Sequence, residues 1–200
     1  MQRIAPVLMI MCAAVGLTAC SSTDTPEVVG YAGDYPSYSS VEDLCNEAEI
    51  VALVSPLGSD VREVDVAGPA GDTEVENPSL GVDDSAEGGK PTPVLIVQTI
   101  TTVRVDAVFK GDIKPGSELE VGQPGGVLED VIYEADSFDF GRSSQSVVFL
   151  DVWPNDVPAS PLNPTQAAYS VSDGGALVSD GSITGLKELV ATSPNSNICK

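Results

Sequence analysis

The side chains that could support catalysis in this chain are mostly carboxylates, because its 200 residues include 30 Asp and Glu but no histidine. Without histidine, neither a Ser-His-Asp nor a Cys-His unit can be assembled, and histidine metal sites are excluded as well. The sequence also lacks G-x-S-x-G, S-x-x-K, G-x-x-x-x-G-K-[ST] and G-x-G-x-x-G. A pair of carboxylates of the glycosidase type stays open, although solvated surface acids account for the same composition. We therefore expect no enzymatic activity, cofactor or metal, with a carboxylate-dependent hydrolase of cell-wall glycan as the alternative.

The four cysteines offer a second kind of chemistry, and Cys20 stands just after an apolar run. Residues 4–17 form this run of 14 residues behind Arg3, whereas a membrane-spanning helix needs roughly 20 apolar residues. A positively charged N-terminal region, a short apolar stretch and small residues before the cleavage site are typical of an export signal that is removed. We expect residues 1–19 to be such a signal.

The junction Leu17-Thr18-Ala19-Cys20 resembles the lipobox of bacterial lipoproteins. This resemblance implies that the chain is cleaved before Cys20 and that the Cys20 sulfur carries a diacylglycerol. Two or more acyl chains hold a protein firmly on a bilayer, so the mature protein is expected on the cell membrane, lipid-anchored and facing outside the cytoplasm. An ordinary export signal cleaved near an incidental cysteine is the alternative.

The charge of the chain limits its partners, because nine Lys and Arg against 30 acids give a net charge of −21. Nucleic-acid binding depends on Lys and Arg that neutralise phosphates, and anionic lipid surfaces attract basic segments. We expect no nucleic-acid partner and no membrane contact other than through Cys20. A protein or another component of the cell envelope is the possible partner.

Cys45 and Cys199 are predicted to form a disulfide. With Cys12 removed in the signal and Cys20 acylated, they are the two thiols left in the mature chain, and an exported location permits oxidation. The bond would tie the two ends of the domain together. A buried free Cys45 with a frayed Cys199 is the alternative.

Two segments have the composition of loops. Residues 20–38 mix Ser, Thr, Gly, Pro and Asp without any period, which predicts a flexible tether whose tyrosines are incidental. Residues 59–93 contain nine acids and two bases, which predicts a long acidic loop. Because no D-x-[DN]-x-[DN]-G spacing occurs in it, we expect no calcium site there. Residues 39–200 are expected to form a single domain.

The periodic segments predict mostly strands. Capping chemistry opens a short helix, either Ser39 with Glu42 or Ser40 with Asp43, and this helix has Cys45 on its apolar face. From residue 101 to 109 apolar and polar residues alternate, and with the turn at 110–116 and the returning strand they predict an antiparallel hairpin. Further strands are expected at 50–58, at 145–154 and twice within 167–183, and a short terminal helix is expected at 186–191.

These elements predict a mainly β fold, a small antiparallel barrel or curved sheet with one short helix at each end. VRVDAVFKGDIKPGSELEVGQPGG followed by SVVFLDVWP resembles exported bacterial proteins of undefined function and, more weakly, the netrin-like barrel of OB type. The resemblance implies only scaffold positions. They are Lys110-Gly111 and Pro115-Gly116 in the turn, Pro124-Gly125-Gly126 as the strand stop and Val148-Phe149-Leu150 in the core.

Overall fold

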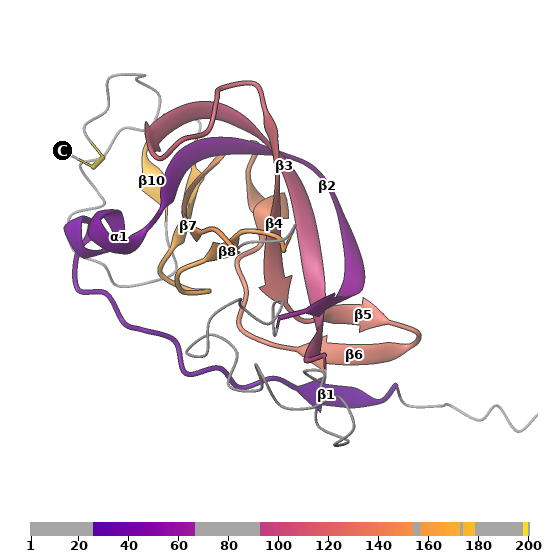
Figure 1. Ribbon diagram of the computed structural model, residues 1–200. Coiled ribbons are helices and arrows are strands. Elements are labelled where there is room, and N and C mark those ends of the chain that lie inside the picture. The colour runs from indigo at the N-terminus through magenta and orange to yellow at the C-terminus, as the bar shows by residue number, and fades with distance from the viewer. Residues whose placement is uncertain (1–25, 67–92, 154–156, 173, 179–197, 200) are drawn as a thin grey trace, which may run out of the picture.

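The computed structural model describes residues 26–66, 93–153, 157–172, 174–178 and 198–199 (Figure 1). The predicted export signal at 1–19, the acylated Cys20 and the predicted helix at 186–191 lie outside these residues.

Two β-sheets make up most of the described structure, as the prediction of a mainly β fold requires. The larger sheet is antiparallel and has seven strands. Its order is β10 (Leu177–Val178), β9 (Ala168–Val171), β7 (Ser146–Asp151), β2 (Ile50–Asp65), β3 (Leu95–Lys110) and β4 (Glu118–Pro124), while β8 (Ser160–Pro161) also pairs with β7. The smaller sheet has the order β1 (Val28–Gly30), β6 (Val131–Glu134) and β5 (Gly126–Leu128).

The larger sheet is strongly curved (Figure 1), and the strand ladders of the described residues leave it open. One parallel bridge joins Val121 in β4 to Ala159, directly before β8. Two backbone hydrogen bonds hold this bridge, from Gly122 N to Ala159 O at 2.8 Å and from Ala159 N to Glu120 O at 3.0 Å. The curved-sheet form of the prediction therefore describes the molecule better than a closed barrel does.

The first five residues of β2 form the centre of the sheet, because residues 50–54 pair with β7 on one side and residues 51–54 pair with β3 on the other. Their side chains alternate between two buried clusters. Val51 and Leu53 join one cluster, which includes Phe149 and Tyr169 in edge-to-face contact with ring centroids 5.9 Å apart. Ile50, Ala52 and Val54 join the other cluster, together with Val103, Val105, Val121, Val148 and Leu150. The sheet is therefore buried on both faces here, as a continuous apolar run predicts.

The predicted hairpin is confirmed by the pairing of β3 with β4, in which Val103 lies opposite Leu119. Val103 and Val105 are fully buried and Arg104 is exposed, as the alternation predicts. Asp173 of the turn predicted between β9 and β10 lies outside the described residues, and Gly175 in this turn has a φ of 80°.

The predicted start of the acidic loop at residue 59 was wrong, whereas its predicted end at residue 93 precedes β3, which begins at Leu95. β2 continues to Asp65 and pairs with β3 as far as Leu95, so residues 59–65 are strand, and Val66 N donates to Val94 O at 2.9 Å. Pro56 does not end the strand because β7 pairs only with residues 50–54. Beyond them no described strand pairs with that side of β2, and proline is tolerated at such an edge. Residues 67–92 lie outside the described part.

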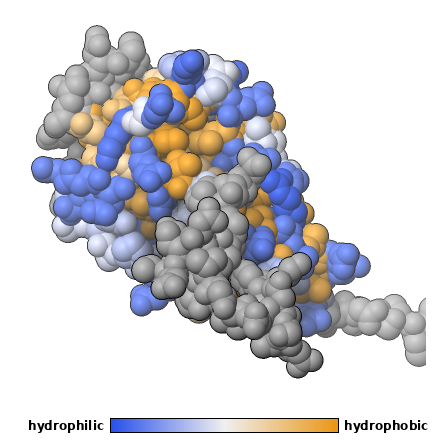
Figure 2. All heavy atoms as spheres, viewed as in Figure 1, coloured by the Kyte–Doolittle hydropathy of each residue, from blue (hydrophilic) through white to orange (hydrophobic). Residues whose placement is uncertain are grey.

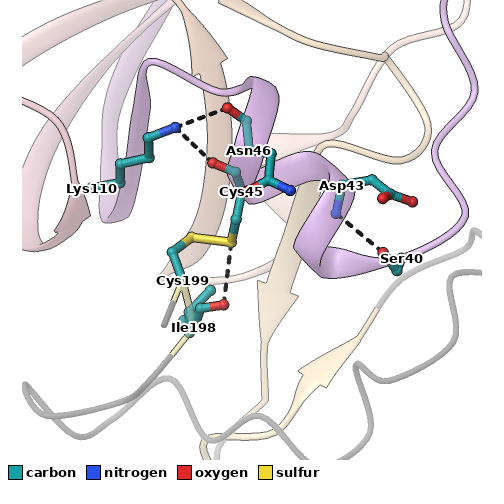
Figure 3. The surroundings of a disulfide bond; sticks show 7 residues. All are labelled: Ser40, Asp43, Cys45, Asn46, Lys110, Ile198 and Cys199. Atoms are coloured by element: carbon teal, nitrogen blue, oxygen red, sulfur yellow. Dashed lines mark hydrogen bonds between the residues drawn. A yellow bond between two sulfur atoms is a disulfide. The ribbon is translucent and has the colours of Figure 1, made fainter.

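The single helix of the described residues, α1 (Val41–Glu47), begins with the second of the two predicted capping frames. Ser40 Oγ accepts a hydrogen bond from Asp43 N at 3.1 Å (Figure 3). At the other end of the helix, Lys110 Nζ donates to the carbonyl oxygens of Cys45 and Asn46 at 2.7 and 3.1 Å. A cation there satisfies carbonyls that have no partner within the helix.

Cys45 and Cys199 are joined in a disulfide, which is the pairing that the sequence predicts, with Cα atoms 5.4 Å apart. The bond holds the end of the chain against α1 (Figure 3), and Cys45 and Ile198 are both part of the first buried cluster. The Ile198 carbonyl oxygen lies 3.2 Å from Cys45 Sγ. Because a disulfide sulfur carries no hydrogen, this is a close contact and not a hydrogen bond.

The predicted tether does not stand apart from the domain where the structure describes it. β1 pairs in parallel with β6, and Ile132 N donates to the Glu27 carbonyl at 2.8 Å. Tyr31 stacks on Tyr133 with ring centroids 5.6 Å apart, and its hydroxyl accepts a hydrogen bond from Val97 N at 3.2 Å. Tyr31, one of the tyrosines that were predicted to be incidental, therefore holds this segment against the domain.

A second set of hydrogen bonds fastens the segment just before α1. Gln166 Oε1 accepts from Tyr38 N at 2.9 Å, and Asn163 Nδ2 donates to the Pro36 carbonyl, also at 2.9 Å. Because Asn163 is almost fully buried, its amide holds the segment to the loop before β9. Within the predicted tether, residues 27–31 and 36–38 are therefore held on the domain, while residues 20–25 lie outside the described part.

We expect Leu53→Ala to lower the free energy of unfolding by about 2–5 kcal/mol, because it leaves a cavity in a buried cluster. The exposed fraction is 6% for Leu53 and 51% for Leu57. Leu57→Ala, in the same strand, is the matched control and should change stability by no more than about 0.5 kcal/mol. Urea unfolding followed by circular dichroism measures both, and equal losses would contradict the central role of residues 50–54.

Candidate functional site

A hollow of about 390 Å³ lies between the segment around the short 3-10 helix η1 (Phe140–Arg142) and the segment that contains β9. Residues 137–143 supply one wall, and residues 164–172 supply the other. Its size is at the lower end of the range for small-molecule pockets. Hydroxyl side chains dominate the polar part of the lining: Ser137, Ser143, Thr165, Ser170 and Ser172.

Three of these hydroxyls already have protein partners. Ser143 Oγ donates to the Gln145 carbonyl at 2.6 Å, Thr165 Oγ1 donates to Asn163 Oδ1 at 3.0 Å, and Ser172 Oγ accepts from Ala176 N at 3.2 Å. The hydroxyls of Ser137 and Ser170 make no hydrogen bond within the described part of the chain. A hydroxyl both donates and accepts, so these two groups can each bind a polar ligand atom of either kind.

The charged groups at the hollow compensate one another. Asp139 Oδ2 and Arg142 Nε are 3.5 Å apart, and the side chains of both residues are more than half exposed. Asp139 Oδ1 also accepts from Gly141 N at 2.8 Å, which fixes the start of the 3-10 helix. Among the described lining residues these are the only charged ones, so the described part of the lining carries no net charge although the chain is strongly acidic.

A buried glutamine positions one wall of the hollow. Gln123, 3% exposed, donates from Nε2 to the Phe138 carbonyl at 3.0 Å and accepts from Phe138 N at 2.7 Å. The Phe138 ring lies edge-to-face with Phe140, with centroids 5.1 Å apart. Sequence reasoning took Gln123 only as the end of a strand, and no local pattern pairs it with a residue 15 positions later. Pro164, Ala168, Val171 and Val178 of β10 add further apolar surface.

A second, more open depression of about 860 Å³ lies where the docked N-terminal segment meets β6. Tyr31, Tyr35 and Tyr133 line it together with Glu134 and Asp136. Its aromatic and acidic lining contrasts with the hydroxyl lining of the first hollow. We give the first hollow more weight because two of its hydroxyls have no partner among the described residues and a buried amide fixes one of its walls.

A half-buried carboxylate, Asp106, occupies a bulge of β3, where Val54 faces Val105 and Leu53 faces Ala107. Asp106 accepts hydrogen bonds from Ser55 Oγ at 2.5 Å, Gln145 Nε2 at 2.8 Å and Arg104 Nε at 3.0 Å. Burial alone raises the pKa of Asp106, but the hydrogen bonds from Ser55, Gln145 and Arg104 outweigh it and hold the pKa below its usual range. Asp106 is therefore ionised at neutral pH and joins three strand segments.

None of the candidate site residues that the sequence singled out lines either depression within the described residues. Cys20 lies outside the described residues, and Cys45 and Cys199 form the disulfide and do not line either depression. Within the described ranges no three His, Cys, Asp or Glu side chains gather as a metal site would need. No helix in the same ranges has the length and apolar character to cross a membrane.

Comparison with protein-family models, with curated proteins and with solved structures finds no match to this chain.

We expect Asp106→Asn to lower the free energy of unfolding at pH 7 by roughly 1–3 kcal/mol, because hydrogen bonds to a charged acceptor are replaced by weaker ones. The pKa of the Asp106 carboxyl is lower in the folded protein than in the unfolded chain. The ionised carboxyl therefore stabilises the folded state at pH values above the unfolded-state pKa, and this stabilisation is lost as the pH falls through the folded-state pKa. The difference between wild type and variant should therefore shrink below about pH 4.

Asp112→Asn, at an exposed turn position, is the matched control. Urea unfolding at several pH values measures both variants. A deficit of Asp106→Asn that stays constant down to pH 2 would show that the carboxylate charge is not the stabilising feature.

Proposed function

We propose that this chain is a lipid-anchored protein of the cell envelope, facing outside the cytoplasm, that binds a ligand without catalysis. The anchor rests on the junction Leu17-Thr18-Ala19-Cys20, whose cysteine would carry the lipid. The binding role rests on one observation, the hollow in which the hydroxyls of Ser137 and Ser170 have no hydrogen-bond partner among the described residues.

The chemistry of the hollow favours a neutral ligand rich in hydroxyl groups, such as one sugar unit of an envelope glycan. Hydroxyls without partners suit a ligand that both donates and accepts hydrogen bonds. The apolar surface from Phe138, Ala168 and Val171 suits the C–H face of a sugar ring. The Asp139–Arg142 pair leaves no excess charge for an ionic ligand.

The order of the strands supports a finer description of the fold, a partly open Greek-key barrel of OB type. Five elements follow one another in space as β2, β3, β4, β8 and β7, and β7 returns to β2. The step from β4 to β8 is the parallel bridge of Val121 with Ala159. OB folds bind oligosaccharides among other ligands, which agrees with the proposed ligand.

The alternative, a carboxylate-dependent hydrolase of cell-wall glycan, has weaker support. Such enzymes place two carboxyl groups about 5–9.5 Å apart around the bond that they cleave, and Asp139 is the one acid among the described residues of the hollow. A general acid also needs a raised pKa, whereas the pKa values of Asp43 and Asp106 are both lowered, that of Asp43 through its hydrogen bonds with Ser39 and Ser40. A binding protein therefore fits the site better.

The anchor is tested by Cys20→Ala in cells. Without a thiol at the junction no lipid can be attached, so the protein should move from the membrane fraction to the soluble fraction. Cys12→Ala, within the apolar run, is the matched control and should leave the protein on the membrane. Retention of Cys20→Ala in membranes would show that another feature anchors the chain.

The ligand class is tested by nuclear magnetic resonance, with a trimer of N-acetylglucosamine as the probe. We expect amide shifts at residues 137–143 and 164–172, and a several-fold weaker affinity in Ser170→Ala, because a net hydrogen bond contributes about 1 kcal/mol. Ser59→Ala, on an exposed part of β2, is the control. Shifts confined to other surfaces, or none at millimolar sugar, would remove the support for a glycan ligand.

A further inference from the structure

We infer that the smaller sheet faces the lipid bilayer and that an apolar row across it contacts the membrane interface. The row consists of Val28 in β1, Ile132 in β6 and Val127 in β5, which lie directly opposite one another in the strand pairing. This inference rests on the proposed acylation of Cys20. It adds an orientation and a contact surface that a lipid anchor alone does not specify.

The first argument is the length of chain between the anchor and the domain. The Glu27 carbonyl accepts a hydrogen bond from Ile132 N at 2.8 Å, so the chain is attached to the smaller sheet from that point. Seven residue steps separate Cys20 from Glu27, and they span at most about 25 Å whatever conformation they adopt. The attachment point on the smaller sheet is therefore held within about 25 Å of the acylated cysteine.

The second argument is the position of the smaller sheet at one end of the molecule. Figure 1 shows α1 and the disulfide at the end opposite to β5 and β6. A domain of this length is roughly 40 Å across, which exceeds the reach of the chain. The end with α1 and the disulfide therefore cannot turn to the membrane while the smaller sheet stays attached, which favours the smaller sheet as the surface that meets the lipid.

The third argument is the character of the outward face. On the inner face, a Cβ at Gly126 would lie 2.8 Å from both Thr99 Oγ1 and Val61 Cγ1, so Gly126 and its partner Tyr133 face the larger sheet. Strand side chains alternate, so the row points the other way. The exposed fraction is 52% for Val28 and 60% for Val127, and Ile132 between them is half-buried.

The charges next to the row limit the contact to the surface of the bilayer. Glu129 and Asp130 form the turn between β5 and β6, both with positive φ, and Figure 2 shows hydrophilic atoms there beside the apolar ones of β5 and β6. Carboxylates repel anionic headgroups and do not enter the acyl region. The row therefore makes a shallow contact, which is stronger on zwitterionic than on anionic lipid.

Tryptophan fluorescence in the acylated protein tests the orientation. Trp153, the one tryptophan of the chain, is changed to Phe, and a reporter is introduced by Val127→Trp or, as a second position in the row, Val28→Trp. Val178→Trp in β10 is the matched control, because Val178 is 53% exposed and Figure 1 shows β10 toward the end that carries the disulfide. Each protein is bound to phosphatidylcholine vesicles with brominated acyl chains, which quench only nearby tryptophans.

We expect at least twofold quenching for Val127→Trp and Val28→Trp and almost none for Val178→Trp. The non-acylated protein made with Cys20→Ala should show no quenching at any position, because the row is too small to bind alone. Equal quenching at all three positions, stronger quenching at Val178→Trp, or none in the acylated protein would overturn the orientation and leave the anchor standing. A mass that shows no lipid on Cys20 would overturn the anchor and the orientation together.

Discussion

The structure depends on the burial of residues 50–54 on both faces of one strand segment. Backbone pairing with β3 and β7 leaves these residues no freedom to rotate, so alternate side chains must enter different clusters. α1, the disulfide and Tyr169 belong to the first cluster, whereas the strands that curve toward the Val121–Ala159 bridge pack around the second. A polar residue at any of the five positions would therefore disturb one cluster directly and the other through the shared backbone.

Several elements could be predicted from the sequence because their signals are local. Alternation specified the buried face of β3 as far as Val105, but beyond the bulge at Asp106, Ala107 and Phe109 pack against the other cluster. Capping chemistry narrowed the start of α1 to two frames, and the presence of two thiols outside the predicted signal and anchor indicated the disulfide. The full length of β2 could not be predicted, because Pro56 and Gly58 have the composition of a turn. They are tolerated at a strand edge with a bulge, and that edge exists only because β7 is short.

The attachment of the N-terminal segment and the hollow were hidden from sequence reasoning for a different reason. A parallel strand of three residues has no period to detect, and its partner β6 lies about a hundred positions away in the chain. The hollow lies between the loop around η1 and the segment that contains β9, and the sequence of neither indicates that they face each other. One wall of the hollow is held by hydrogen bonds between the Gln123 side-chain amide and the Phe138 backbone. Local composition does not predict a hydrogen bond between a side chain and a backbone group 15 residues away.

The disulfide has a consequence for the covalent integrity of the chain. Because Cys45 and Cys199 are linked, a single cut of the backbone by a protease anywhere between residues 46 and 198 yields two fragments that stay joined through sulfur. With the lipid proposed at Cys20, both fragments also stay with the cell. Such a nicked molecule separates into its two pieces only after reduction, so it migrates as one chain on a non-reducing gel and as two on a reducing gel.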